Sequence, residues 1–190
     1  MRYPEYVEIE NKRYKINTDF RVAIKCNEIA TDKTIGDYER ALAIIYTLFG
    51  EEGINTPSHY EKLLEMSKKY LLCGDKEINT DDEPDMDYIQ DMDYIEASFM
   101  SDYHIDLSNT KMHWWKFSNL INGLSNSELG DCCVLNRIRN LRNFDTKEIK
   151  DSKEKQKIEE AKERVALKKK VATKEQQENV ESILKDLGLL

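Results

Sequence analysis

The sequence predicts a mainly α-helical protein with a small N-terminal β-hairpin, a helical bundle and an extended, charged C-terminal helical arm. Apolar residues repeat at three- and four-residue spacing over most of the chain beyond residue 18, which is the period of an amphipathic helix. The two Trp, ten Tyr and five Phe all lie before Asp145, whereas residues 145–190 contain no aromatic residue and are rich in charged helix formers. We therefore expect the hairpin and helical body within residues 1–144 and the arm within residues 145–190.

The N-terminal elements are marked by alternation, caps and a proline. Residues 6–16 alternate polar and β-prone apolar side chains on either side of Glu10-Asn11-Lys12, as a short hairpin does. Thr18 or Asp19 can cap a first helix, and the proline after Thr56 suits the first position of a later helix. The helices expected in this part of the chain cover residues 18–30, 38–49 and 56–74.

Negative charge is concentrated between Asp75 and Asp106, where twelve carboxylates accompany a single lysine, Lys76. Beyond Pro84 this acidic block predicts a helix, because five apolar or aromatic residues fall on one narrow stripe with polar residues beside it. The carboxylates on this helix have two interpretations. They form a solvated face opposite a buried one, or they form a surface that binds a basic partner. The stripe consists of Tyr88, Met92, Ile95, Phe99 and Tyr103, and its polar flank of Asp87, Asp91, Ser98 and Asp102.

The pentapeptide Asp-Met-Asp-Tyr-Ile occurs twice in the acidic block, at residues 85–89 and 91–95. Its six-residue offset does not match the helical period, so on a helix the second copy faces a different way from the first. Helical periodicity therefore gives no reason for the duplication.

A tryptophan pair marks the next expected helix. Trp114 shares a helical face with four apolar residues that follow it, whereas Trp115 lies about 100° further round. Either another helix of the same domain covers Trp115, or this side chain anchors a partner, since exposed aromatic residues are frequent binding hot spots. The residues that share the face of Trp114 are Phe117, Leu120, Ile121 and Leu124.

The arm carries two helix-start signals. Asp145 and Glu148 have the spacing of a capping pair before a charged helix that runs to about Lys170, and Thr173 and Gln176 have the same spacing before a short terminal helix. Both helices have too little apolar surface for a core of their own, so they must dock on the body, on a second copy or in a partner groove. Their apolar stripes are Ile158, Ala161, Val165 and Ala172 in the first, and Val180, Ile183, Leu184 and Leu187 in the second.

The composition argues against several classes of protein. The chain has 29 basic and 37 acidic residues, a net charge of −8, which disfavours a general binder of nucleic acid or anionic membrane, because phosphate groups need clustered Lys and Arg. The four cysteines are sparse, and neither a secretory signal nor an apolar run of membrane-spanning length precedes them. We therefore expect reduced thiols in a cytoplasmic protein.

Motifs of catalysis and metal binding are missing from the sequence. It has no nucleophile elbow, phosphate loop, dinucleotide fingerprint or H-E-x-x-H motif. Adjacent Cys132 and Cys133 are poorly placed to share a zinc ion with His113. The alternating acids from Asp81 to Asp87 lack the glycine and the bidentate glutamate of a calcium loop. We expect a protein that is not an enzyme and that needs no cofactor or metal.

Four segments, in this order, carry a family resemblance: residues 3–21, the acidic aromatic segment 93–99, the Ile-Asp-Leu turn at 105–107 and the tryptophan segment 113–120. They resemble a family of tail-assembly proteins from bacteriophages and prophages of Gram-positive bacteria, encoded near the tape-measure gene. An Arg-rich stretch and a Lys/Glu-rich tail extend the resemblance over most of the chain. His104 departs from the family pattern, in which we expect a small residue such as Gly before the Ile-Asp-Leu turn. The Arg-rich stretch contains Arg137, Arg139 and Arg142.

The resemblance implies a non-catalytic tail-assembly chaperone. Such a protein would coat the tape-measure protein, help the major tail protein to add around it, work in the host cell cytoplasm and be absent from the finished tail. We expect the arm, from Thr146 to Leu190, or the tryptophan helix to engage the tape measure, with the acidic block facing a basic surface. Self-association is a further expectation. The residues expected to bind a partner are Trp114, Trp115, Tyr94, Asp87, Asp91, Asp102, Val180, Ile183, Leu184 and Leu187.

The alternative is an acidic DNA mimic or adaptor that binds a basic host or phage protein. The net charge of the acidic block, with twelve carboxylates against one lysine, suggests this role. A mimic needs its carboxylates exposed in a phosphate-like row, whereas here they alternate with apolar residues of a buried stripe. The chaperone interpretation is therefore preferred.

Overall fold

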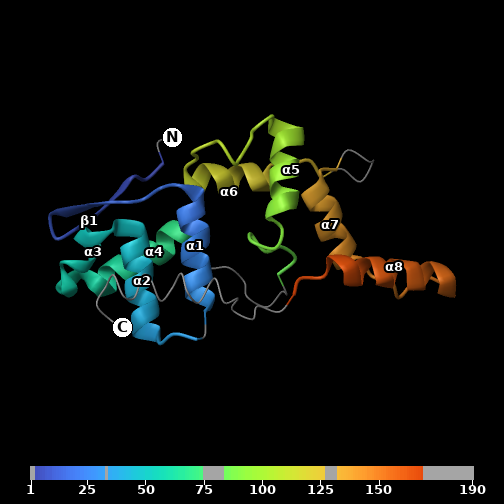
Figure 1. Cartoon of the computed structure of the whole chain (residues 1–190), viewed down its shortest axis with the longest axis horizontal. Coiled ribbons are helices and arrows are strands. Elements are labelled where there is room, and N and C mark those ends of the chain that lie inside the picture. The colour runs from blue at the N-terminus through green and yellow to red at the C-terminus, as the bar shows by residue number, and fades with distance from the viewer. Residues whose placement is uncertain (1–2, 33, 75–83, 127–131, 169–190) are drawn as a thin grey trace. The chain divides into compact units, whose positions relative to one another are not determined.

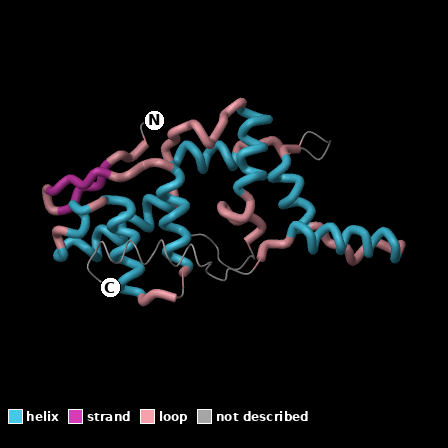
Figure 2. The backbone as a smooth tube through the Cα atoms, in the orientation of Figure 1, coloured by secondary structure: helices cyan, strands magenta, loops and turns pink. Residues whose placement is uncertain are grey.

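Eight α-helices and one two-stranded hairpin make up the part of the chain that the structure, a computed structural model, describes: residues 3–32, 34–74, 84–126 and 132–168. Helices predominate throughout (Figures 1 and 2). The prediction of a mainly α fold with an N-terminal hairpin is confirmed. None of the described helices combines the length and the apolar character that crossing a membrane requires.

The described chain forms two compact units. The first holds the described residues up to Gly74 together with residues 111–118, and the second holds residues 84–110 and 119–168. Helix α6 (Trp114–Asn122) gives its first residues to the first unit and its last residues to the second. Each unit has fully buried apolar side chains: Tyr14, Phe20, Ile29, Ile45, Leu48 and Leu63 in the first, and Ile95, Phe99, Leu107 and Leu135 in the second.

The hairpin opens the first unit. Strands β1 (Tyr6–Ile9) and β2 (Lys12–Lys15) pair antiparallel. Glu10 and Asn11 both have positive φ angles, 50° and 67°, which a two-residue type I′ turn requires. The turn is thus one residue shorter than the expected Glu10-Asn11-Lys12, and the second strand begins earlier.

Four α-helices and a short 3₁₀ helix complete the N-terminal part of the first unit. Asp19, rather than Thr18, caps α1, because its side chain accepts a hydrogen bond from Arg21 N at 3.0 Å. Pro57 opens the 3₁₀ helix η1 and not the α-helix expected there, so α4 begins three residues later. The elements are α1 (Phe20–Thr31), α2 (Asp37–Phe49), α3 (Glu51–Ile54), η1 (Pro57–His59) and α4 (Tyr60–Leu71).

The second unit contains α5 (Met92–Tyr103) and α7 (Val134–Asn143). Ile95 and Phe99 are buried, as the expected stripe requires. The helix is shorter than expected, because Tyr88 lies in a turn before Met92. The Asp87 carboxylate stabilises that turn, since its Oδ1 accepts hydrogen bonds from the main-chain N–H groups of residues 89 and 90, each at 3.0 Å.

Helix α8 (Ser152–Val165) also belongs to the second unit, and none of its residues is buried. It begins seven residues after the expected cap, Asp145. Asp151 is the actual cap, since its Oδ1 accepts hydrogen bonds from Lys153 N at 2.8 Å and Glu154 N at 3.4 Å. Asp145 instead accepts from Lys147 N at 2.9 Å, which closes a local turn. The expected terminal helix, from Thr173 onward, lies outside the described residues.

Candidate functional site

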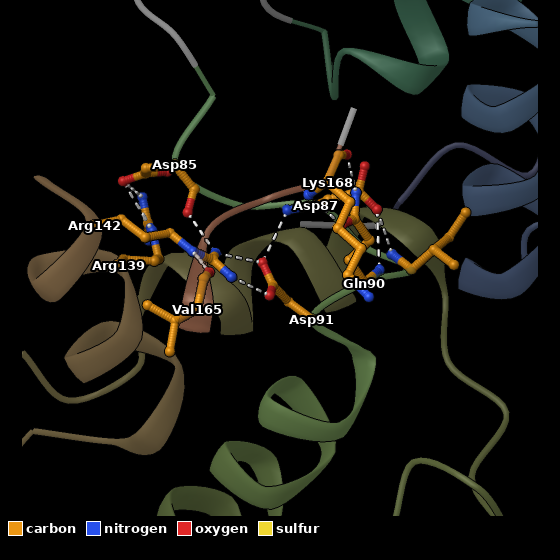
Figure 3. Close-up of polar contacts among 9 residues, drawn as sticks. Asp85, Asp87, Gln90, Asp91, Arg139, Arg142, Val165 and Lys168 are labelled. Carbon is orange, nitrogen blue, oxygen red and sulfur yellow. Dashed lines mark hydrogen bonds and ion pairs between the residues drawn. The ribbon is translucent and has the colours of Figure 1, made fainter. Parts of the chain in front are cut away.

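The acidic segment of the second unit meets helix α7 through a buried ion pair. Arg142 donates from Nη1 to Asp91 Oδ2 at 2.8 Å and from Nη2 to Asp91 Oδ1 at 2.7 Å, so the pair is bidentate (Figure 3). The two side chains are only 9% and 1% exposed. Burying two charges costs free energy, which the mutual attraction and further hydrogen bonds must offset. The surroundings of this pair supply several such bonds.

Arg142 connects three segments of the second unit. Besides Asp91 it donates from Nη1 to the main-chain oxygen of Asp85 at 2.8 Å and from Nε to that of Val165, at the end of α8, at 2.6 Å (Figure 3). Asp91 Oδ2 accepts a further hydrogen bond from Asp87 N at 3.0 Å. The hydrogen bonds to the Asp91 carboxylate raise the pKa of Arg142 above its usual value, against the opposing effect of burial. Arg142 therefore stays charged and holds the acidic turn, α7 and the end of α8 together.

A second pair lies beside the first. Arg139 donates from Nε to Asp85 Oδ2 at 3.1 Å, and Asn143 donates from Nδ2 to the same oxygen at 3.2 Å. Arg139 and Arg142 are three residues apart and so lie on one face of α7. We call Asp85, Asp91, Arg139 and Arg142 the aspartate-arginine clasp.

The clasp gives a physical reason for the repeated Asp-Met-Asp-Tyr-Ile. Asp85 and Asp91 are the first residues of the two copies, and each pairs with one arginine of α7. The copies differ in other respects, because Ile89 of the first is 36% exposed whereas Ile95 of the second is fully buried. The six-residue offset thus repeats an ion-pairing position and does not repeat a helical face.

The last described residue is held next to the clasp. Gln90 Nε2 donates to Lys168 O at 3.0 Å, and Lys168 N donates to Gln90 Oε1 at 2.8 Å (Figure 3). The Gln90 amide therefore pairs with both main-chain polar groups of one residue. A shallow cavity of about 360 Å³ lies nearby, lined by the segment at Asp85, by Arg142 and by Leu167 among others.

The chemistry available at the clasp is that of holding chain segments. A guanidinium keeps its protons at physiological pH, so Arg142 cannot serve as a proton acceptor, and the Asp91 carboxylate already accepts three hydrogen bonds. Among the described residues, no three His, Cys, Asp or Glu side chains gather in a way that could hold a metal ion.

A protein-family model described as Bacteriophage Gp15 protein matches residues 2–167. The chain belongs to the Bacteriophage Gp15 protein family. The matched span includes the clasp, the four segments that carried the resemblance and every described residue of the two units except Lys168. No curated protein matches the chain, and no solved structure matches it.

The acidic residues expected to bind a partner lie in different settings in this Gp15-family protein. The expectation that Asp91 lies on a polar, solvated flank is wrong, because the residue is fully buried and paired with Arg142. Ser98 of the same flank is also buried, and its Oγ accepts from Leu135 N at 3.0 Å. Asp87 and Asp102 are partly exposed, and Asp102 accepts from Ser125 N at 2.8 Å. Binding roles for Asp87 and Asp102, and for the partly exposed Tyr94, stay predictions.

Both tryptophans of the Gp15-family protein form hydrogen bonds to the end of α4 within the first unit. Trp114 Nε1 donates to Leu71 O and Trp115 Nε1 donates to Tyr70 O, both at 2.9 Å. The Trp115 ring also stacks on Tyr70, with ring centroids 6.3 Å apart, and a Cβ added at Gly74 would lie 3.2 Å from it. This geometry favours the interpretation in which another helix of the same unit covers Trp115. Binding of a partner by the partly exposed Trp115 or the buried Trp114 stays a prediction.

Three residues of this site in the Gp15-family protein were not identified by sequence analysis. Arg139 and Arg142 join the acidic turn to α7, and Gln90 joins it to the segment after α8, across 51 to 78 residues of sequence. The signals that could have found the arginines were the Arg-rich stretch and the repeated pentapeptide, but neither shows which aspartate meets which arginine. The predicted binding residues of the terminal helix lie outside the described residues: Val180, Ile183, Leu184 and Leu187.

Proposed function

We propose that this Gp15-family protein is a non-catalytic chaperone of phage tail assembly, which binds the tape-measure protein and assists assembly of the tail tube. The observation that carries the proposal is the family match over residues 2–167. The segments in which the chain resembles tail-assembly proteins lie inside that span. The protein would act in the host cell cytoplasm, with the major tail protein as a second partner, and would be absent from the finished tail.

The described surface of the second unit supports such a role. Helix α8 has no buried residue, and its stripe of Ile158, Ala161 and Val165 is only partly covered. An amphipathic helix with so little of its own to bury gains stability by laying that stripe against another helix. The long helical chain of a tape measure would offer such a partner.

Helix α5 presents a second surface that fits this partner. Its outward positions include Asp93, Ala97 and Met100, which follow one another at helical spacing and are exposed. Met100 is 48% exposed and is the large apolar side chain of this outward face. A surface with an apolar residue beside carboxylates is complementary to a partner helix that carries both apolar and basic residues.

The clasp also explains why we prefer this function to DNA mimicry. Asp85 and Asp91 are paired with arginines of the same chain, so these two carboxylates do not contribute to a row that imitates phosphates. A mimic would need most of the acidic block to face solvent.

Co-expression with the tape-measure protein encoded nearby tests the proposal. We expect the tape-measure protein to become soluble and to co-purify with the wild-type chain. Met100→Lys should weaken co-purification, because it places a charge on the exposed apolar position of α5. Asn122→Lys adds the same charge at another exposed position and is the matched control. Recovery of a host DNA-binding protein, with no gain in tape-measure solubility, would favour the DNA mimic and contradict the chaperone.

A further inference from the structure

The residues at the end of α8 are hydrogen-bonded to the second unit through their main chain. Gln90 exchanges two hydrogen bonds with the N–H and C=O of Lys168, and Arg142 Nε donates to the C=O of Val165 at 2.6 Å. None of these bonds uses a side-chain atom of residues 165–168. The Gln90 amide donates to the C=O of Lys168 and accepts from its N–H, as a neighbouring β-strand does for a residue in a hydrogen-bonded pair.

The held segment leaves the helix after Val165 and is shallowly bound. Helix α8 ends at Val165, and Ala166 has φ −59° and ψ 139°, which is an extended conformation. Ala166 and Lys168 are exposed, and Leu167 is partly exposed. Little apolar surface therefore secures the segment, and contacts of this kind open more readily than a buried core.

We propose that Gln90 and Arg142 form a recognition site for the main chain of an extended polypeptide, which residues 165–168 of this chain occupy until a partner segment replaces them. Arg142 is kept in place by Asp91 whether or not the segment is bound, so the site is preorganised. The site reads main-chain groups and so accepts many sequences, as coating of a long protein requires. On a tape measure it would bind a stretch that is not helical, because the main-chain groups of a helix bond to one another, while the stripes of α5 and α8 would bind helical stretches. This inference deepens the proposed function, and it rests on that function only in taking the tape measure as the partner.

The test uses the full-length protein and a fluorescent, end-blocked hexapeptide with the sequence of residues 163–168, Glu-Arg-Val-Ala-Leu-Lys. Lys168→Pro removes the N–H that Gln90 Oε1 accepts and so weakens the internal segment without altering the site. We expect fluorescence anisotropy to show about tenfold tighter binding of the peptide to this variant than to the wild type, the effect of about one hydrogen bond. A peptide N-methylated at its last residue lacks the same donor and should bind about tenfold more weakly than the unmodified one.

Gln90→Ala in the Lys168→Pro background should return peptide affinity to the wild-type level or below. Gln156→Ala, at an exposed glutamine of α8, is the matched control and should change nothing. Equal binding of the plain and N-methylated peptides would overturn the inference, and it does so even if Lys168→Pro fails to fold. Dimerisation of Lys168→Pro without peptide would overturn it too, because a second copy would then fill the site.

The outcomes for this site and for the chaperone proposal are distinguishable. If Gln90→Ala abolishes peptide binding while the tape-measure protein still co-purifies as well as with the wild type, this site is not where the tape measure binds. If the peptide binds as expected but the tape-measure protein never becomes soluble, the recognition site stands and the chaperone proposal falls.

Discussion

Arg142 and Asp91, 51 residues apart in the sequence, form a bidentate ion pair that is almost completely withdrawn from solvent. The pair joins helix α7 to the start of α5, and the same guanidinium donates to the end of α8. Removing one member would leave the other charged and buried, a much larger loss than breaking an exposed ion pair. The second unit should therefore depend on this pair for its stability.

Asp91→Asn should lower the free energy of unfolding by about 3–5 kcal/mol, because the amide keeps the shape of the side chain but leaves the buried guanidinium without a counter-charge. Urea denaturation followed by circular dichroism measures the change. Asp93→Asn, two residues along at an exposed position, is the matched control and should alter stability by less than about 0.5 kcal/mol. Equal effects of the two substitutions on the free energy of unfolding would show that the ion pair with Arg142 does not stabilise the protein more than an exposed carboxylate does.

His104 should be replaceable by glycine with a gain in stability. It ends α5 in the left-handed conformation, with φ 55° and ψ 34°, which costs any residue with a Cβ. We expect His104→Gly to raise the free energy of unfolding by about 1 kcal/mol. Thermal unfolding checks this, with His104→Ala as the control that keeps the Cβ and gains nothing. A lower melting temperature for the glycine variant would mean that the imidazole makes a contact that outweighs the strain.

Tyr14→Phe should destabilise the first unit by about 1–3 kcal/mol, because it leaves a buried polar atom without its partner. The Tyr14 hydroxyl lies 2.7 Å from His59 Nδ1 and links β2 to the residue before α4. Tyr6→Phe removes a hydroxyl from a residue that is 39% exposed and is the matched control, with an expected effect near zero. Denaturation midpoints of the two variants measure the difference in stability. Equal midpoints for Tyr14→Phe and Tyr6→Phe would show that the contact with His59 adds no stability.

Burial raises the pKa of the Cys26 thiol from its usual 9.0 to about 12. The unfolded chain loses this proton near pH 9 while the folded chain keeps it, so the contribution to stability is complete below pH 9 and is lost as pH rises from 9 through 12. At pH 10 the free energy of unfolding should have fallen by about 1 kcal/mol through this thiol.

Cys26→Ala removes that thiol and, with it, the smaller electrostatic contribution of Cys26 to the pKa of Tyr70, which burial raises first. Urea titrations at pH 8 and pH 10 should show a smaller fall in stability for the variant than for the wild type. Identical falls would mean that the Cys26 thiol is accessible to solvent in the folded protein.

The two tryptophans should respond differently to a soluble quencher. In Trp115→Phe the remaining Trp114 is 2% exposed and should resist acrylamide, whereas in Trp114→Phe the remaining Trp115 is partly exposed and should be quenched to an intermediate degree. Steady-state fluorescence checks both. Full quenching of Trp115, as in a free peptide, would show that the contact with Tyr70 is absent in solution.

Local patterns were sufficient to predict much of the fold. Alternation around Glu10 predicted the hairpin, and the buried positions of Ile95 and Phe99 follow from helical spacing. Such features depend on residues within a few positions of one another. The start of α8 was missed because Asp145 and Asp151 can both cap a helix, and nothing local shows which of them will.

The clasp was not predictable because its partners are brought together by the tertiary fold. The stripe around Asp91 suggested an exposed polar flank, since a carboxylate is rarely buried without a partner. That partner, Arg142, lies two helices further along the chain. Sequence spacing shows which residues share a helix face but cannot show which distant side chain faces them.

The measurement that tests the chaperone proposal most directly is light scattering by the purified tape-measure protein after dilution from denaturant, with and without an equimolar amount of the wild-type chain. The proposal predicts that the chain suppresses scattering and that the two proteins then elute together in size-exclusion chromatography. An unrelated protein of equal charge at the same concentration should not suppress it. Scattering that is the same with this chain as with that control would contradict the proposal.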